Sequence, residues 1–107
     1  MEKNIQIGLL YEFYSNLLTE KQSYIIDSYY NNDLSLAEIA DNIKITRQGV
    51  QKQIKDSERI LLNYEDKLHL LENHLNNKKI IVNIIQKIEK YDIKEKDDII
   101  SNLNKLN

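Results

Sequence analysis

Six polar side chains between residues 47 and 59 have the types and spacing that recognition of nucleic acid requires. Arginine can form a bidentate pair of hydrogen bonds with guanine, glutamine can do so with adenine, and lysine suits phosphates. Four of the side chains step by four, three and four residues, so they share one face of a helix, and the other two flank that face near its N-terminal end. The candidate nucleic-acid-binding residues are Arg47, Gln48, Gln51, Lys52, Lys55 and Arg59.

The alternative interpretation of this face is a plain solvated helix surface, which almost any helix supplies. Local charge favours nucleic acid slightly, because the segment from Lys44 to Lys55 carries four cations and no acid. Asp56 and Glu58 follow directly and are expected to limit any footprint. The whole chain has 15 basic and 17 acidic residues, a net charge of −2, whereas dedicated nucleic-acid binders usually have a basic excess. Strong non-specific binding is therefore not expected.

The pattern from residue 34 to 54 predicts a helix-turn-helix that would hold this face outward. Ser35 with Glu38 forms a capping box before a short amphipathic helix, and Thr46 can cap a second helix. Apolar residues line the inner faces of both helices, and one lies in the turn to fill the space between them: Leu36, Ile39, Ala40, Ile43, Ile45, Val50 and Ile54. Such units most often place the second helix in the DNA major groove, although some are only packing units.

Two residues near the turn are unusual for their positions. Gly49 lies inside the second helix and costs about 1 kcal/mol relative to alanine. A close helix crossing is the favoured explanation, with close approach of a ligand backbone as the alternative. Lys44 lies where glycine often adopts a left-handed conformation, and Asn42 is the other residue that could make the turn.

Helical periodicity continues over nearly the whole chain, which has no proline and only two glycines. We expect an all-α fold with a long central helix and a C-terminal helical extension. Helices are predicted over residues 4–18, from a Thr19–Gln22 capping box through Tyr29, from Thr46 to about Asn76, over residues 77–91 and over residues 97–106, with a turn at 31–33 and a break at 92–95. The prediction is one domain, residues 1–107, with a helix-turn-helix core at 4–60 and an extension at 61–107.

The central helix is predicted to carry an apolar seam that needs a partner. Its members alternate steps of four and three: Val50, Ile54, Ser57, Leu61, Tyr64, Leu68, Leu71 and Leu75. The following helix has an isoleucine seam of its own, at Ile80, Ile81, Ile84, Ile85 and Ile88. The C-terminal helices of the same chain could cover the central seam, or a second copy could do so in a homodimer, and the sequence leaves both open.

Signatures of catalysis and of cofactor binding are missing. No glycine-rich phosphate loop is present, and no nucleophile is flanked by a plausible base. His69 and His74 are five residues apart, so with Glu65 and Glu72 they make only a weak metal site, and a solvated face is favoured. We expect no enzyme, no catalytic residue, no metal and no cofactor. Tyrosines 11, 14, 24, 29 and 30 could stack on bases, but their helical spacing favours packing.

The sequence also bears on location in the cell. It has no cysteine, no apolar run near the ~20 residues of a membrane span and no visible secretory signal. We therefore expect a cytoplasmic protein without direct membrane insertion.

A run of residues in the first two thirds closely resembles the YlxM family of small bacterial proteins, over about residues 4 to 72. The resemblance is carried by Phe13-Tyr14-Ser15, Leu17-Leu18-Thr19-Glu20-Lys21-Gln22, Tyr29-Tyr30, Asp33-Leu34-Ser35-Leu36, Glu38-Ile39-Ala40, Arg47-Gln48, Val50 and Ile54-Lys55. The chain departs from the family on the second helix of the motif. Alanine and tyrosine are usual at the places of Gly49 and Gln51, Asp-Asn where Lys52-Gln53 stand, and a base at Asp56.

The resemblance implies a fold similar to region 4 of bacterial sigma factors. It also implies a non-catalytic accessory or regulatory role in the signal recognition particle pathway, with the particle's GTPase, its RNA, or both as partners. The alternative is a sigma-region-4-like transcriptional regulator that binds duplex DNA as a monomer or as a homodimer. The near-neutral charge favours the first function, and the fold favours the second.

Overall fold

The computed structural model describes residues 1–91 and 94–106, and every regular element in that part of the chain is helical. The predicted all-α class is therefore confirmed. The chain divides into two compact units, Met1–His69 and Leu70–Asn107, which are described separately below. The expected boundary after residue 60 falls inside a helix of the first unit.

The first unit contains four α-helices and two short helical turns of other types. The α-helices are α1 (Lys3–Tyr14), α2 (Glu20–Ile26), α3 (Leu36–Ile43) and α4 (Arg47–Leu68). A 3₁₀ turn, η1 (Ser15–Leu17), follows α1, and a π-helical turn, η2 (Asp27–Asn31), continues α2 up to the predicted turn at 31–33. Helices α3 and α4 are the predicted helix-turn-helix.

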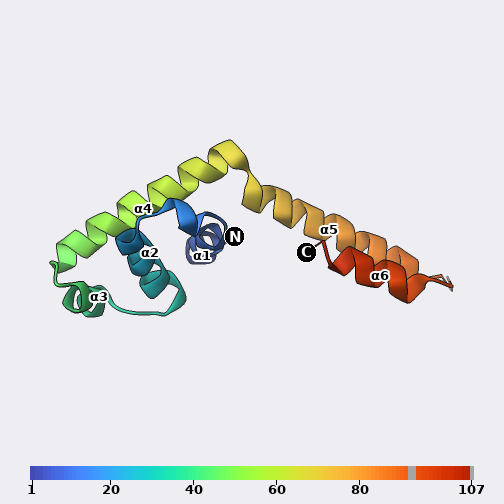
Figure 1. Ribbon diagram of the computed structural model, residues 1–107, viewed down its shortest axis with the longest axis horizontal. Helices are drawn as coiled ribbons and strands as arrows, with labels where there is room; N and C mark the ends of the chain where they lie inside the picture. The colour runs from blue at the N-terminus through green and yellow to red at the C-terminus, as the bar shows by residue number, and fades with distance from the viewer. Residues whose placement is uncertain (92–93, 107) are drawn as a thin grey trace. The chain divides into compact units, whose positions relative to one another are not determined.

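Helix α4 is the element on which the first unit is assembled. Helices α1, α2 and α3 all contact it, and Figure 1 shows the three along one side of α4. The inner face of α4 is formed by Val50, Ile54, Ser57 and Leu61, each at most 6% exposed. The facing helices contribute the rest of the core: Ile7, Leu10, Tyr14, Ile25, Ile26, Ile39 and Ala40. Burial of each large apolar side chain contributes about 1.5–3 kcal/mol, so this shared core fixes the orientation of α4.

Side-chain caps define where three of the four helices begin, as the sequence predicts. The Thr19 hydroxyl accepts a hydrogen bond from the Gln22 amide at 3.1 Å, and the Gln22 side chain accepts one from the Thr19 amide at 3.0 Å. Ser35 and Glu38 form the same reciprocal pair before α3, with both distances 3.1 Å. The Thr46 hydroxyl accepts from the Gly49 amide at 2.9 Å before α4. Each such cap contributes about 1 kcal/mol, and together they confirm the predicted starts.

The turn between α3 and α4 is made by Lys44, which adopts a left-handed conformation with φ 58° and ψ 45°. The alternative that Asn42 makes the turn is wrong, because Asn42 lies inside α3 and its side-chain amide donates to the Tyr24 hydroxyl at 3.0 Å. A left-handed conformation is unfavourable for lysine because its Cβ approaches a carbonyl oxygen. The C-cap of α3, a position where glycine is common, is thus occupied by a lysine with a strained backbone.

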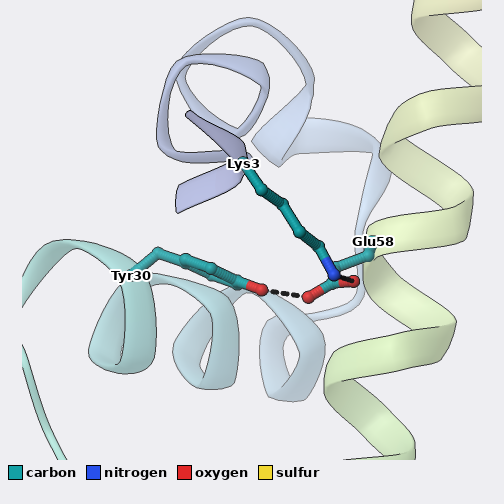
Figure 2. A network of polar contacts seen from close by, with 3 residues as sticks. All are labelled: Lys3, Tyr30 and Glu58. Atoms are coloured by element: carbon teal, nitrogen blue, oxygen red, sulfur yellow. Dashed lines mark hydrogen bonds and ion pairs between the residues drawn. The ribbon is translucent and has the colours of Figure 1, made fainter. Parts of the chain in front are cut away.

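A polar network on the inner side of α4 ties three segments together (Figure 2). Glu58 of α4 is only 9% exposed, and one of its carboxylate oxygens accepts a hydrogen bond from the Tyr30 hydroxyl of η2. The other oxygen pairs with the ammonium group of Lys3, at the start of α1, at 3.2 Å. Burial, followed by the bond to Glu58, raises the pKa of Tyr30, so the phenol stays protonated as the donor. These two partners offset the free-energy cost of burying the charged Glu58 carboxylate.

Helix α4 ends at Leu68, earlier than the sequence predicts. His69 adopts φ 55° and ψ 30°, and its amide closes the last turn by donating to the Glu65 carbonyl at 2.8 Å. The predicted continuation to about Asn76 is therefore wrong, and so is a break at Asn76–Asn77, because α5 (Leu70–Glu89) runs through that dipeptide. Histidine is among the residue types that tolerate the left-handed conformation best, which allows the break without glycine or proline.

The second unit is a pair of helices, α5 and α6 (Lys96–Asn104), that lie side by side (Figure 1). The predicted last helix is confirmed, with its ends shifted from 97–106. Of the predicted break at 92–95, Lys94 and Glu95 lie in a turn, while Asp92 and Ile93 are outside the described residues. Helix α6 packs against α5 of its own chain, and Ile81 of α5 is 5% exposed.

The conformation of Lys44 generates a prediction about stability. Lys44→Gly should raise the free energy of unfolding by up to about 1 kcal/mol, because glycine adopts φ near +58° without steric cost. The matched change Asn42→Gly should lower it by about 1 kcal/mol or more, since it places glycine in α3 and removes the bond to Tyr24. Urea denaturation of both variants tests this, and equal signs for the two changes would contradict the assignment of the turn.

The Glu58 network generates a second prediction. Tyr30→Phe should lower the free energy of unfolding by about 1–3 kcal/mol, because a buried carboxylate loses a donor. Tyr29→Phe is the control, since the Tyr29 ring is 37% exposed beside Tyr30, and it should be nearly neutral. The raised pKa of Tyr30 means that its contribution is complete below pH 10 and declines above it as the unfolded phenol ionises. The gap between Tyr30→Phe and wild type should therefore stay constant from pH 8 to about pH 10 and narrow above pH 10 in urea titrations.

Candidate nucleic-acid interface

The N-terminal half of α4 presents the predicted candidate residues to solvent. All six, Arg47, Gln48, Gln51, Lys52, Lys55 and Arg59, are exposed. By the 3.6-residue period of the helix, Gln48, Lys52, Lys55 and Arg59 lie opposite the buried Val50 and Leu61, and Gln51 lies beside them. Arg47 is three residues before Val50, so it lies on the inner side of the helix and is exposed because it is the first residue of α4. The structure therefore brings five of the six side chains together on the side of α4 that faces away from α1, α2 and α3. We call these six residues the α4 polar face.

The start of α4 is held by the turn that precedes it. The Ile45 amide donates to the Ala40 carbonyl at 3.2 Å, and the Ile45 side chain is half-buried, as expected for the residue that fills the space between the helices. Thr46 then caps the helix through the Gly49 amide. The first turn of α4 contains no acid, so its N-terminal amides add to the positive potential of the surrounding side chains. These contacts position the first two turns of the α4 polar face.

The far end of the face is partly neutralised within α4 itself. The Arg59 guanidinium pairs with the Asp56 carboxylate at 2.8 Å, one turn earlier on the helix. This ion pair is largely solvent-exposed and therefore weak, so a phosphate could compete for Arg59. Among the residues that the structure describes, no carboxylate forms an ion pair with Arg47, Lys52 or Lys55, so the positive charge of the face is concentrated at these three residues.

Glu58 does not limit the footprint as the sequence suggests. Its carboxylate faces inward, toward Tyr30 and Lys3, and the residue is buried against α1 and η2. The prediction failed because a glutamate is rarely buried, and only the distant partners on α1 and η2 make its burial possible. Asp56 alone of the two acids borders the exposed face.

Gly49 has a different neighbourhood from the one predicted. A Cβ at this position would lie 3.1 Å from the Thr46 hydroxyl and 3.6 Å from the Ile45 side chain. These atoms belong to the cap and the turn, and not to the helix α3 that crosses α4. The helix-crossing explanation is therefore wrong, and the contact that keeps this position small is the N-cap itself.

Lys44 is a residue that the candidate set leaves out although its position fits the same surface. It is exposed in the turn immediately before α4, with its backbone in the left-handed conformation. The sequence does contain the signal, because Lys44 begins the acid-free run. As the turn residue and the first cation of that run, Lys44 lies at the N-terminal edge of the α4 polar face.

The tyrosines of the first unit have mixed environments. Tyr14 is 1% exposed, and its ring stacks on Tyr64 of α4 with centroids 6.0 Å apart. Tyr29 and Tyr30 meet edge to face at 5.0 Å, and Tyr24 accepts the hydrogen bond from Asn42. These contacts favour the packing interpretation over base stacking.

The described part of the chain offers neither a metal-binding cluster nor a membrane-spanning helix. Within residues 1–91 and 94–106, no three His, Asp or Glu side chains approach closely enough to hold a metal ion. None of the helices there has both the length and the apolar character needed to cross a bilayer. The α4 polar face is thus the candidate site that the sequence and the geometry jointly indicate.

Comparison with known proteins agrees with the helix-turn-helix. Residues 1–102 match a family model, UPF0122, described as a YlxM/p13-like helix-turn-helix protein. A UPF0122 protein of Clostridium botulinum is 44% identical over 98 residues, which cover 91% of this chain and 90% of that protein. A UPF0122 protein of Streptococcus pneumoniae is 38% identical over 105 residues, covering 97% and 96% of the two chains. A third, from Lactococcus lactis, is 42% identical over 87 residues, covering 81% and 78%. This chain therefore belongs to the UPF0122 family of YlxM/p13-like helix-turn-helix proteins.

Proposed function

We propose that this protein is a non-catalytic accessory or regulatory protein that binds nucleic acid through the α4 polar face. The observation that carries the proposal is the placement of five exposed donors and cations on the outward side of α4, with Arg47 exposed at its acid-free start. Side chains near the N-terminal end of a recognition helix contact base edges, and lysines around them contact phosphates. Arg47, Gln48 and Gln51 are assigned to bases, and Lys52 and Lys55 to phosphates.

The charge of the face sets the strength of the proposed binding. The run from Lys44 to Lys55 offers four cations, and the acids of the rest of the chain oppose a larger footprint. Neutralising about four phosphates gives an affinity that falls roughly 100-fold between 50 and 200 mM salt. Affinity should therefore be modest, and a structured target that offers additional contacts would be preferred over random duplex.

The resemblance to the YlxM family supports the proposal that this binding serves the signal recognition particle pathway. The particle's RNA is then the proposed ligand of the α4 polar face, and the particle's GTPase is a second partner. The near-neutral net charge is consistent with a protein that joins a ribonucleoprotein and does not search a genome.

A second function is favoured by a specific observation, the outward placement of α4 in a capped helix-turn-helix. In DNA-binding units of this kind, the second helix enters the major groove. A sigma-region-4-like regulator would use the same residues, so the two functions differ in ligand and not in surface.

Fluorescence anisotropy with labelled signal recognition particle RNA at 150 mM salt tests the proposal. Micromolar or tighter binding that resists random duplex DNA as competitor is expected. If any duplex DNA displaces the RNA equally well, the DNA regulator is favoured. If the protein binds neither nucleic acid, the proposed function of the face is contradicted.

Paired variants locate the binding surface. Lys52→Ala with Lys55→Ala should weaken binding at least about 10-fold, because two phosphate contacts are lost. Lys21→Ala with Lys67→Ala removes two exposed lysines from α2 and from the last turn of α4, and it should leave the affinity within about 2-fold after the same change in net charge. Equal losses in the two double variants would show that only net charge matters and would contradict the assigned face.

A further inference from the structure

Helix α5 carries an open groove on a side that α6 does not cover. The groove has a volume of about 460 Å³ and is lined by Leu75, Lys78, Lys79, Val82 and Asn83. Its floor is apolar, with Val82 42% exposed, and two lysines stand at its rim. Ile81, which follows Ile80 and precedes Val82 on α5, is buried, and α5 is in contact with α6. The second unit thus has a second apolar side with a basic rim.

Helix α6 has the complementary character. Its apolar residues Ile99, Ile100 and Leu103 are all only half-buried against α5, so part of this surface remains accessible. Its first turn carries Asp97 and Asp98. An amphipathic helix with an acidic start is what an apolar groove rimmed by lysines can accept.

The α6 of the same chain cannot satisfy this complementarity. Helix α6 starts just after the end of α5 and runs back beside it (Figure 1). Lys79 and Glu89 are ten residues apart on α5, a rise of about 15 Å. The acids of α6 therefore lie near the far end of α5, and the structure contains no ion pair between Lys78 or Lys79 and Asp97 or Asp98.

We infer that the α5 groove binds α6 of a second copy of this chain, and that the two helix pairs associate in antiparallel orientation. When two α5 helices pack antiparallel with their Val82 residues opposite each other, the C-terminal end of one helix, at Glu89, lies beside Leu75 of the other. The first turn of the partner's α6 then lies against Lys78 and Lys79, and its apolar side covers Val82. The contact is isologous, because each copy supplies one groove and one α6.

The resulting assembly is a four-helix bundle made from two α5–α6 pairs. Such bundles bury two neighbouring sides of every helix, which accounts for the apolar character of both sides of α5 at Ile81 and Val82. Each assembly would carry two α4 polar faces. The inference stands independently of the proposed nucleic-acid binding, since none of its residues belongs to that face.

Mass measurement by light scattering after size exclusion tests the inference with matched substitutions on α5. The wild-type chain should elute with twice its mass of 12.7 kDa at about 50 µM. Val82→Glu should give the monomer mass, because it places an acid in the groove opposite Asp97 and Asp98. Ile80→Glu makes the same change at a 56% exposed position outside the groove and should leave the dimer mass. A monomeric wild type, or dissociation by Ile80→Glu and not by Val82→Glu, would overturn the inference.

Charge exchange tests the pairing of the two surfaces directly. Lys78→Glu with Lys79→Glu, and Asp97→Lys with Asp98→Lys, should each yield monomers because like charges then meet at both contacts. An equimolar mixture of the two variants should recover the dimer mass, since both contacts become complementary again. Two dimeric variants, or a mixture that remains monomeric, would overturn the inference. The double variant Lys78→Glu with Lys79→Glu could also keep the dimer mass and lose RNA binding. That result would overturn the inference and would show that the two lysines bind phosphates.

Discussion

Burial of one side of α4 is the constraint on which the first unit depends. Val50, Ile54 and Leu61 can leave water only if α1, α2 and α3 gather on the same side of the helix. Once they do so, the opposite side of α4 is exposed to solvent. The outward presentation of Gln48, Lys52 and Lys55 is therefore a consequence of core packing, and not a separate feature. The same packing brings η2 and the start of α1 close enough to bind the buried carboxylate of Glu58.

Local features of the fold could be predicted from the sequence because they depend on neighbouring residues. The caps formed by Thr19, Ser35 and Thr46 each involve a partner three residues away, so residue type and spacing suffice. The helical class follows equally from periodicity and from the absence of proline. The exposure of the α4 polar face could be predicted as well, because it lies opposite a clear apolar stripe.

Features that depend on distant contacts or on backbone strain could not be predicted. The inward orientation of Glu58 requires Tyr30 and Lys3, which are far away in sequence and become neighbours only in the fold. The end of α4 at His69 has no glycine or proline to mark it, and the apolar spacing continues across the break. Gly49 was interpreted through a helix crossing, whereas its close neighbours are its own cap and turn. Strain at Lys44 and His69 is likewise not apparent from residue type.

The two units divide the proposed roles between them. The first presents a small cationic face whose charge is limited by Asp56 and by the acidic remainder of the unit, and the second offers an apolar groove for another copy of the chain. A chain of net charge −2 can carry the proposed nucleic-acid interface because the segment from residue 44 to 55 contains four cations and no acid. A weak face gains in effective affinity when it is present twice in one assembly.

The most direct test of the central claim is a titration of ¹⁵N-labelled protein with the signal recognition particle RNA, followed by amide chemical shifts at low salt. The account predicts that the largest changes fall on residues 44–55, while α1, η2 and α5 keep their shifts. Changes centred on α5 or on the η2 surface, or no changes at all, would contradict the claim that α4 is the nucleic-acid-binding helix.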